Sequence, residues 1–216
     1  MKSVCILAVA AAVTCAVPAQ AEQGNVHVRA RAILVSPTEK ASPVLPTFST
    51  GSVSVTASWA PEVDVTYFVK PHIGVELIAA TTKHKVHGEG SLTGVGKVAD
   101  TWVLPPTLTL QYHFAPEAKV RPYVGVGVNY THFYSEKASS SLQTAIGSTA
   151  VHLKDSFGYD LQAGVDVQLQ RNLFLNLDVK YIDIDTTARL TTGTLVNRVK
   201  VSLDPIVAGV GIGVRF

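Results

Sequence analysis

The last stretch of the chain, LDPIVAGVGIGVRF (203–216), alternates apolar with small or polar residues up to the terminal Phe216. Successive side chains of a strand point to opposite faces. One face of such a strand carries the apolar side chains of Ala208, Val210, Ile212, Val214 and Phe216. An aromatic residue that ends such a face is typical of bacterial outer-membrane barrels and rare in soluble proteins. We therefore expect this strand to close a β-barrel in lipid.

The first 21 residues have the pattern of a secretory signal peptide. A basic start precedes an apolar run over 4–17, and Ala19-Gln20-Ala21 forms a cleavage site. The run is shorter than the ~20 residues of a membrane-spanning helix. We expect residues 1–21 to be removed and 22–216 to form one barrel domain. Both cysteines, Cys5 and Cys15, lie in the removed segment, so no disulfide or thiolate metal site would remain.

The rest of the chain reads as eight alternating strands. They are 26–35, 58–69, 73–82, 103–114, 121–134, 156–169, 173–185 and the C-terminal segment 203–216. Each has about the ~9–11 residues that a tilted strand needs to cross a bilayer. Lipid offers no hydrogen bonds to an open sheet edge, so the strands must close. The sequence predicts an all-β fold, an eight-stranded antiparallel transmembrane barrel.

The connections alternate in length, which sets the orientation. Residues 69–72, 115–120 and 170–172 form short turns, expected in the periplasm, and the long segments are expected as extracellular loops. The long segments are 36–57, 83–102, 135–155 and 186–202. Two aromatic girdles are expected, with Tyr67, Tyr112, Phe114 and Phe216 below and Tyr130, Tyr134, Tyr159 and Tyr181 above.

Inward positions in the lower and middle lumen are charged. The predicted plug consists of Arg29, Arg31, Glu62, Asp64, Glu76, Asp160, Asp166, Asp178, Lys180 and Arg215, with Arg121 nearby. An eight-stranded barrel has little more interior room than its own side chains fill. Because buried charges must pair or cost several kcal/mol each, we expect a salt-bridged plug.

Inward positions toward the outside are apolar. The predicted ligand-binding residues of this upper lumen are Ile33, Val35, Ile78, Val103, Phe133, Ile182, Ile184 and Val207. A porin would be polar here, whereas an apolar cup suits a small hydrophobic molecule. Ordinary packing of the barrel top is the other interpretation. Pro61 and the pair Pro105-Pro106 lack a ladder donor, which indicates either a gap in the wall or strands that end above the membrane.

Six segments carry a resemblance to a known family. They are VRARAILVSP (28–37), LPPTLTLQYHF (104–114), PYVGVGVNYTHF (122–133), SFGYDLQAGVDV (156–167), LFLNLDVKYIDID (173–185) and LDPIVAGVGIGVRF (203–216). Together they resemble the OmpW family of bacterial outer-membrane proteins. The resemblance implies a barrel with a hydrophobic, gated channel for small hydrophobic molecules. Some members of the family are linked to phage or colicin recognition. That role does not carry over to this chain, because its predicted loops match no pattern of the family.

The expected partners are outer-membrane lipid, a small hydrophobic solute and the barrel assembly machinery, which would read Phe216. We expect a monomer, with an oligomer left open. The net charge of +2, without a basic block, argues against nucleic acid. No cofactor is expected.

Enzyme and metal functions are the weaker interpretations. His84 and His87 are spaced so that they could bind a metal ion as a pair. His132 and His152, with the serines of the loops, are residue types that occur in catalytic sites. Solvated surface is the simpler interpretation of all four, so we expect no enzyme. The main alternative to a channel is a non-conducting structural or receptor barrel that displays its loops. A lipocalin-type soluble barrel would need the reverse pattern, an apolar interior with a polar exterior.

Overall fold

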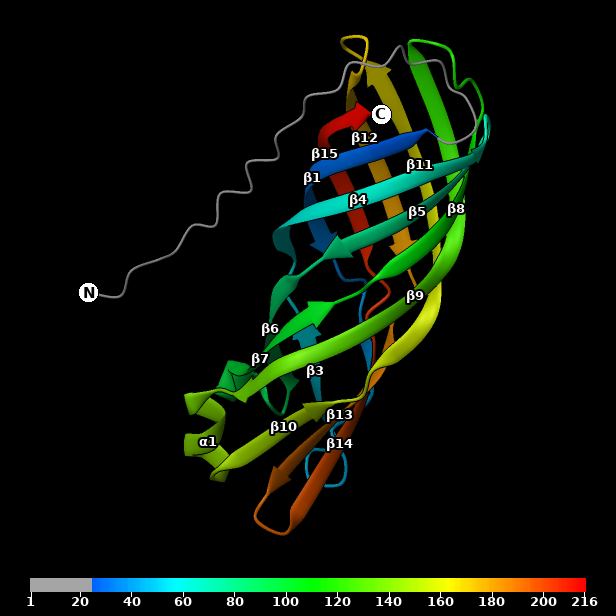
Figure 1. Cartoon of the computed structure of the whole chain (residues 1–216). Helices are drawn as coiled ribbons and strands as arrows, with labels where there is room; N and C mark the ends of the chain where they lie inside the picture. The colour runs from blue at the N-terminus through cyan, green and yellow to red at the C-terminus, as the bar shows by residue number, and fades with distance from the viewer. Residues whose placement is uncertain (1–24) are drawn as a thin grey trace, which may run out of the picture.

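A computed structural model describes residues 25–216 (Figure 1). The predicted signal peptide, with Cys5 and Cys15, lies outside the described residues. The barrel consists of β1 (Val26–Ser36), β4 (Ser58–Lys70), β5 (Ile73–Ala80), β8 (Thr107–His113), β9 (Val120–Ala138), β11 (Ser156–Gln168), β12 (Leu173–Ile182) and β15 (Ile206–Arg215). Every neighbouring pair is antiparallel, and β9 with β11 completes the ring. The predicted eight-stranded barrel is confirmed.

The first and last strands of the ring pair with each other. β1 and β15 run side by side from His27 opposite Arg215 to Ser36 opposite Ile206. At the end of this seam the Phe216 N–H donates to the Val26 carbonyl at 2.9 Å, and the Val26 N–H donates to the Phe216 carbonyl at 3.3 Å. The C-terminal segment therefore closes the barrel.

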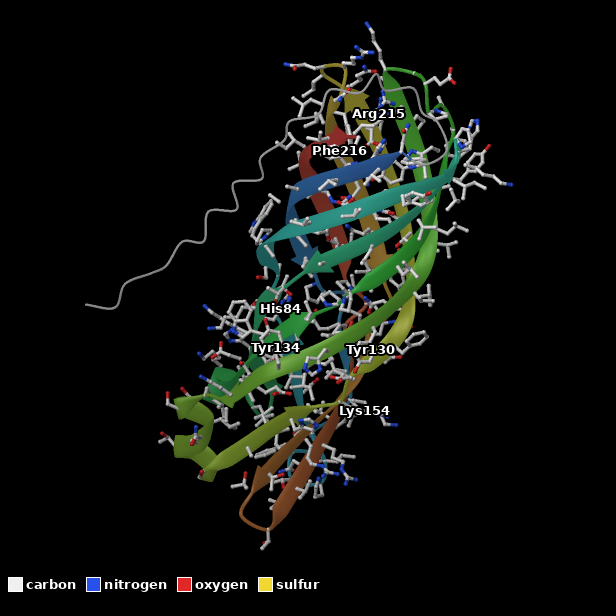
Figure 2. All side chains as sticks on the ribbon, in the orientation of Figure 1. His84, Tyr130, Tyr134, Lys154, Arg215 and Phe216 are labelled. Atoms are coloured by element: carbon white, nitrogen blue, oxygen red, sulfur yellow. The ribbon has the colours of Figure 1, made fainter. Side chains whose placement is uncertain are left out.

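The outer wall is apolar between two levels of aromatic side chains. Its exposed apolar residues include Val63, Val65, Leu77, Leu108, Leu110, Val126, Val128, Leu161, Leu177, Val179, Val210 and Ile212. Figure 2 shows Phe216 at one end of the barrel and Tyr130 nearer the other. Trp59 and Phe157, both exposed, extend the upper level beyond the predicted girdle residues. This band is the surface that contacts lipid.

Inward glycines on β15 make room for large side chains from its neighbours. A Cβ at Gly211 would lie 2.7 Å from Cγ of Arg31, and one at Gly213 would lie 2.3 Å from Cζ of Phe174. The alternation of glycine with apolar residues in the C-terminal strand therefore has two causes. The apolar residues on one face contact lipid, and the glycines on the other face leave room for large side chains in the lumen.

Most of the segments expected as extracellular loops continue as strands. They contain β2 (Lys40–Ala41), β3 (Gly51–Val55), β6 (Thr82–Gly90), the 3-10 turn η1 (Thr93–Val95), β7 (Lys97–Leu104), α1 (Ser140–Ile146), β10 (Thr149–Leu153), β13 (Asp185–Thr192) and β14 (Leu195–Ser202). β3, β6 and β7 follow β9 in the large sheet, and β10, β13, β14 and β2 form a second sheet. Together they extend the barrel beyond the membrane (Figure 1). Within residues 25–216, no helix is long and apolar enough to cross a membrane.

Three predicted strands are divided in the structure. The segment 103–114 is two strands, because β7 ends at Leu104 and β8 begins at Thr107 on either side of Pro105-Pro106. Neither proline has an N–H to donate to a ladder. The segments 73–82 and 173–185 also divide. At each of these two points the chain leaves the membrane barrel and starts an extracellular strand, β6 or β13.

Charge on the lipid-facing wall should destabilise the barrel strongly. Leu177, at mid-strand between Val165 and Val210, is 44% exposed, and Leu195 at the tip of the β13–β14 hairpin is 43% exposed. We expect Leu177→Arg to lower the free energy of unfolding by about 2–4 kcal/mol in a bilayer. Leu195→Arg, equally exposed but in water, should be close to neutral. Denaturant titration in liposomes measures both, and equal effects would contradict the assignment of the membrane band.

The terminal aromatic residue should contribute more to assembly than an aromatic residue of the same size elsewhere at this end of the barrel. The sequence predicts that the assembly machinery reads this end, so we expect Phe216→Ala to reduce the amount of barrel in the outer membrane. Phe114→Ala is the matched control, since Phe114 is exposed at the same end without being terminal. Membrane levels measured by heat-modifiable gel mobility test this. Equal losses in the two variants would leave only a packing role for Phe216.

Candidate functional site

The upper part of the lumen contains one large cavity. About 1450 Å³ of atom-free space lies among its lining residues, a volume that includes open solvent. All eight predicted residues line it, namely Ile33, Val35, Ile78, Val103, Phe133, Ile182, Ile184 and Val207. They reach it from β1, β5, β7, β9, β12, β15 and the segment between β12 and β13. Whether they bind a ligand stays a prediction.

The extracellular strands, turns and helix add an apolar roof that the sequence did not predict. The further lining residues include Val44, Phe48, Val53, Leu92, Leu142, Leu190, Val199 and Val201. Leu142 is buried on α1, whose N-cap Ser139 accepts a 3.0 Å hydrogen bond from the Leu142 N–H. Alternation in the supposed loops, such as Val199, Val201 and Leu203, was the available signal.

His84 is the one histidine among the lining residues of the cavity. Its Nδ1 lies 2.8 Å from the Thr56 carbonyl, which can only accept, so Nδ1 carries the hydrogen. Its Nε2 lies 2.9 Å from Oγ1 of Thr82 and accepts from that hydroxyl. Burial lowers the pKa of His84, which keeps the ring neutral near pH 7. Both nitrogens are engaged, so His84 is not available to form a metal pair with His87.

The floor of the cavity is an ion pair. Nζ of Lys180 lies 2.7 Å from Oε1 of Glu62, and both residues line the cavity. Nζ also lies 3.0 Å from Oδ2 of Asp178. The apolar space therefore ends on a neutralised charged layer.

Below this floor Arg29 forms ion pairs with three carboxylates. Its Nη1 lies 2.8 Å from Asp64 and 3.1 Å from Glu76, and its Nη2 lies 3.4 Å from Asp166. Nη1 also donates to the Thr66 hydroxyl at 2.8 Å. The Arg29 side chain has no exposed surface.

Arg31 connects a second set. Its Nε lies 2.8 Å from Glu62, its Nη2 lies 2.7 Å from Asp64 and 3.3 Å from Glu76, and its Nη1 lies 3.1 Å from Asp178. The two arginines share Asp64 and Glu76, so the ion pairs form one continuous network across the lumen.

All ten residues predicted for the plug are buried. Asp160 accepts a 3.0 Å hydrogen bond from the Thr109 hydroxyl and belongs to no ion pair of the network. Arg215 lies near the opposite, periplasmic end (Figure 2). The network and its hydrogen-bonded neighbours occupy the barrel axis, so the arrangement can oppose passage of solutes straight through. That role stays a prediction.

The remaining histidines lie outside the cavity. Nδ1 of His132 lies 3.0 Å from Asp155, which also accepts from the Tyr130 hydroxyl at 2.6 Å. These bonds lower the pKa of Asp155, Tyr130 contributing most. His152 lies 3.7 Å from Glu136 on the exposed surface. No group of metal-ligating side chains occurs within the described part of the chain.

Comparison with known proteins agrees with this geometry. The profile of the OmpW family matches residues 22–216. The chain is 39% identical over 197 residues to outer membrane protein W of Escherichia coli strain K12, with 90% of each covered. The chain belongs to the OmpW family. The crystal structure of OprG from Pseudomonas aeruginosa matches this OmpW-family chain with a TM-score of 0.84 and 32% identity, covering 90% of this chain and 97% of OprG.

A more distant relative is the dibenzothiophene metabolism operon protein PahQ of Pseudomonas aeruginosa. It is 31% identical over 134 residues, covering 61% of this chain and 59% of PahQ. The family and these relatives place the OmpW-family chain in the bacterial outer membrane, in contact with its lipid. The OmpW family, with outer membrane protein W and OprG, consists of outer-membrane barrel proteins and not enzymes, as expected.

Removing one arginine of the network should cost more than removing a surface arginine. We expect Arg31→Met to lower the free energy of unfolding by about 3–5 kcal/mol, because buried carboxylates lose their partner. Arg171→Met, in the exposed turn after β11, should change it by less than about 0.5 kcal/mol. Denaturant unfolding in detergent measures the difference. A small effect at Arg31 would show that water reaches the network and replaces the missing partner.

Proposed function

We propose that the protein is a channel that takes small hydrophobic molecules from outside the cell into the outer membrane. The apolar cavity above the charged layer carries this proposal. Transfer of an apolar solute from water into such a space gains roughly 25 cal/mol per Å² buried. An ion or sugar would lose hydration there without compensation. The name of the relative PahQ, which refers to dibenzothiophene metabolism, supports a substrate of this class.

The charged network argues against a straight path into the periplasm. An apolar solute that continued along the axis would have to separate the ion pair of Lys180 with Glu62, and then the pairs of Arg31 and Arg29. Each separation would leave buried charge without a partner, which is strongly unfavourable. The solute would therefore leave by another route.

The wall beside the cavity supports a sideways exit. The ladder between β4 and β5 ends at Glu62 opposite Ala80, and both residues line the cavity. Pro61 follows at the outer end of this ladder, and Pro105-Pro106 interrupts the wall between β7 and β8. Prolines cannot supply the N–H groups that would continue these ladders. We infer that apolar solutes pass from the cavity into the bilayer at this level.

Charge in the cavity should slow uptake. We expect Phe133→Asp combined with Ile182→Asp to slow the transfer of an apolar dye into liposomes by about tenfold or more, because unpaired charge disfavours the solute. Ion conductance should stay unchanged or rise. The control combines Ala150→Asp with Leu195→Asp, which adds the same charge at exposed extracellular positions.

Two dye sensors, one in the bilayer and one inside the liposome, identify the route. Arrival in the bilayer first would support the sideways exit, and simultaneous arrival in the interior would contradict it. Unaltered flux in a folded cavity variant would exclude the channel. The non-conducting structural or receptor barrel would then be the better interpretation.

A further inference from the structure

The outer face of the small extracellular sheet carries unpaired positive charge. On β13 and β14 the side chains of Leu190 and Val199 line the cavity, so the alternate positions Arg189, Arg198 and Lys200 point outward. All three are exposed, as is Lys154 at the end of β10. We call these four residues, Lys154, Arg189, Arg198 and Lys200, the basic face.

The strand register brings these cations together. Arg189 lies directly opposite Arg198 in the β13–β14 ladder, and exposed His152 lies opposite Arg189 on the other side. One row nearer the membrane, Lys200 lies opposite Thr187, whose carbonyl accepts the Lys154 N–H at 3.1 Å. Like charges directly opposite each other destabilise an antiparallel pair. The arginine pair therefore has an unfavourable interaction that an anion would relieve.

No carboxylate of residues 25–216 forms an ion pair with any member of the basic face. Glu136 on β9 lies 3.7 Å from His152 and accepts the Leu153 N–H. Asp185, on the same face as the arginines, accepts from the Ser202 hydroxyl and lies four residues from Arg189, about 13 Å along the strand. Asp155, next to Lys154, is already bonded to Tyr130 and His132. The two arginines keep their donors free for a ligand.

The position of the basic face identifies the ligand. Phe157, 73% exposed and opposite Tyr130, marks the outer aromatic level. Lys154 lies three residues beyond it, about 10 Å along an extended chain, and the arginine row lies about 16 Å beyond it. Figure 2 shows Lys154 between the barrel and the β13–β14 hairpin. The basic face is therefore continuous with the lipid-contacting wall. Because the headgroup layer on one side of a bilayer is only about 5–7 Å thick, Lys154 lies at its outer edge and the arginine row lies beyond it, where the larger sugar headgroup of a glycolipid extends.

We propose that the basic face binds the phosphate groups of a glycolipid headgroup in the outer leaflet, with Arg189 and Arg198 gripping one phosphate between them. The guanidinium fork matches phosphate oxygens in a bidentate way. Lys154 and Lys200 add positive charge nearer the bilayer, where each cation strengthens attraction to anionic lipid. This site is independent of the cavity, so it stands whether or not the barrel conducts.

Glycolipid binding to the full mature barrel in phosphocholine nanodiscs tests the proposal. The probes are purified lipopolysaccharide, the same lipid after removal of its phosphates, and inorganic pyrophosphate. We expect Arg189→Gln combined with Arg198→Gln to weaken lipopolysaccharide binding about thirtyfold, the loss expected for two cations at an anionic surface. The dephosphorylated lipid and pyrophosphate should each bind wild type weakly.

Lys83→Gln combined with Lys85→Gln is the matched control. These exposed lysines lie on β6, where Lys85 is opposite Asp100. Their removal should change the affinity by less than about threefold, because surface charges that face an acid contribute little. Equal weakening in both variants would mean general charge attraction and would overturn the site. Equal binding of dephosphorylated lipid, or of pyrophosphate, would also overturn it.

Thermal unfolding without glycolipid gives a second, independent readout. Because Arg189 opposes Arg198, their replacement by glutamine should raise the melting temperature of the ligand-free barrel while reducing the stabilisation by lipopolysaccharide. A lower melting temperature in the ligand-free state would show that the arginines serve the fold, and would overturn the proposal.

Discussion

Two arginines of β1 hold the lumen together, because they bind carboxylates from four other strands. Arg29 and Arg31 together contact acids of β4, β5, β11 and β12. Burying so many charges has a desolvation cost, so the network is not a simple source of stability. Its main effect is on register. A shift of one residue in β1 would turn both guanidiniums toward lipid and leave the acids unpaired, so only one closed arrangement is acceptable.

The same network divides the barrel interior into a charged lower part and an apolar upper part. Below Lys180 and Glu62 the interior is filled by the ion-pair network together with buried polar and aromatic side chains such as Gln111, Tyr123 and Phe174. Above them the described lining is almost entirely apolar. An apolar space of this size persists because the extracellular strands roof it, and those strands gain stability by burying the side chains that form the roof. A single set of contacts therefore stabilises the extracellular sheets and makes the cavity apolar.

The barrel strands were predictable because lipid imposes a strict alternation, visible in segments such as 173–182 and 206–215. The cavity residues followed from the same alternation at the strand tops. The roof did not, because β3 and β10 have only five residues each and the polar outer face of β14 resembles loop composition. The division at Pro105-Pro106 was suspected from the prolines. Its outcome depended on β9, which is long enough to pair with both β7 and β8.

The seam between β1 and β15 has a consequence for the time course of folding. Its hydrogen bonds join Val26 to Phe216, so nearly the whole described chain forms the loop that they close. Contacts of such sequence separation form late and slowly. Until the last strand arrives, β1 presents an unpaired edge that other chains can join. The exposure of this protein to aggregation and proteolysis is therefore governed by how long the edge stays open, rather than by the stability of the finished barrel.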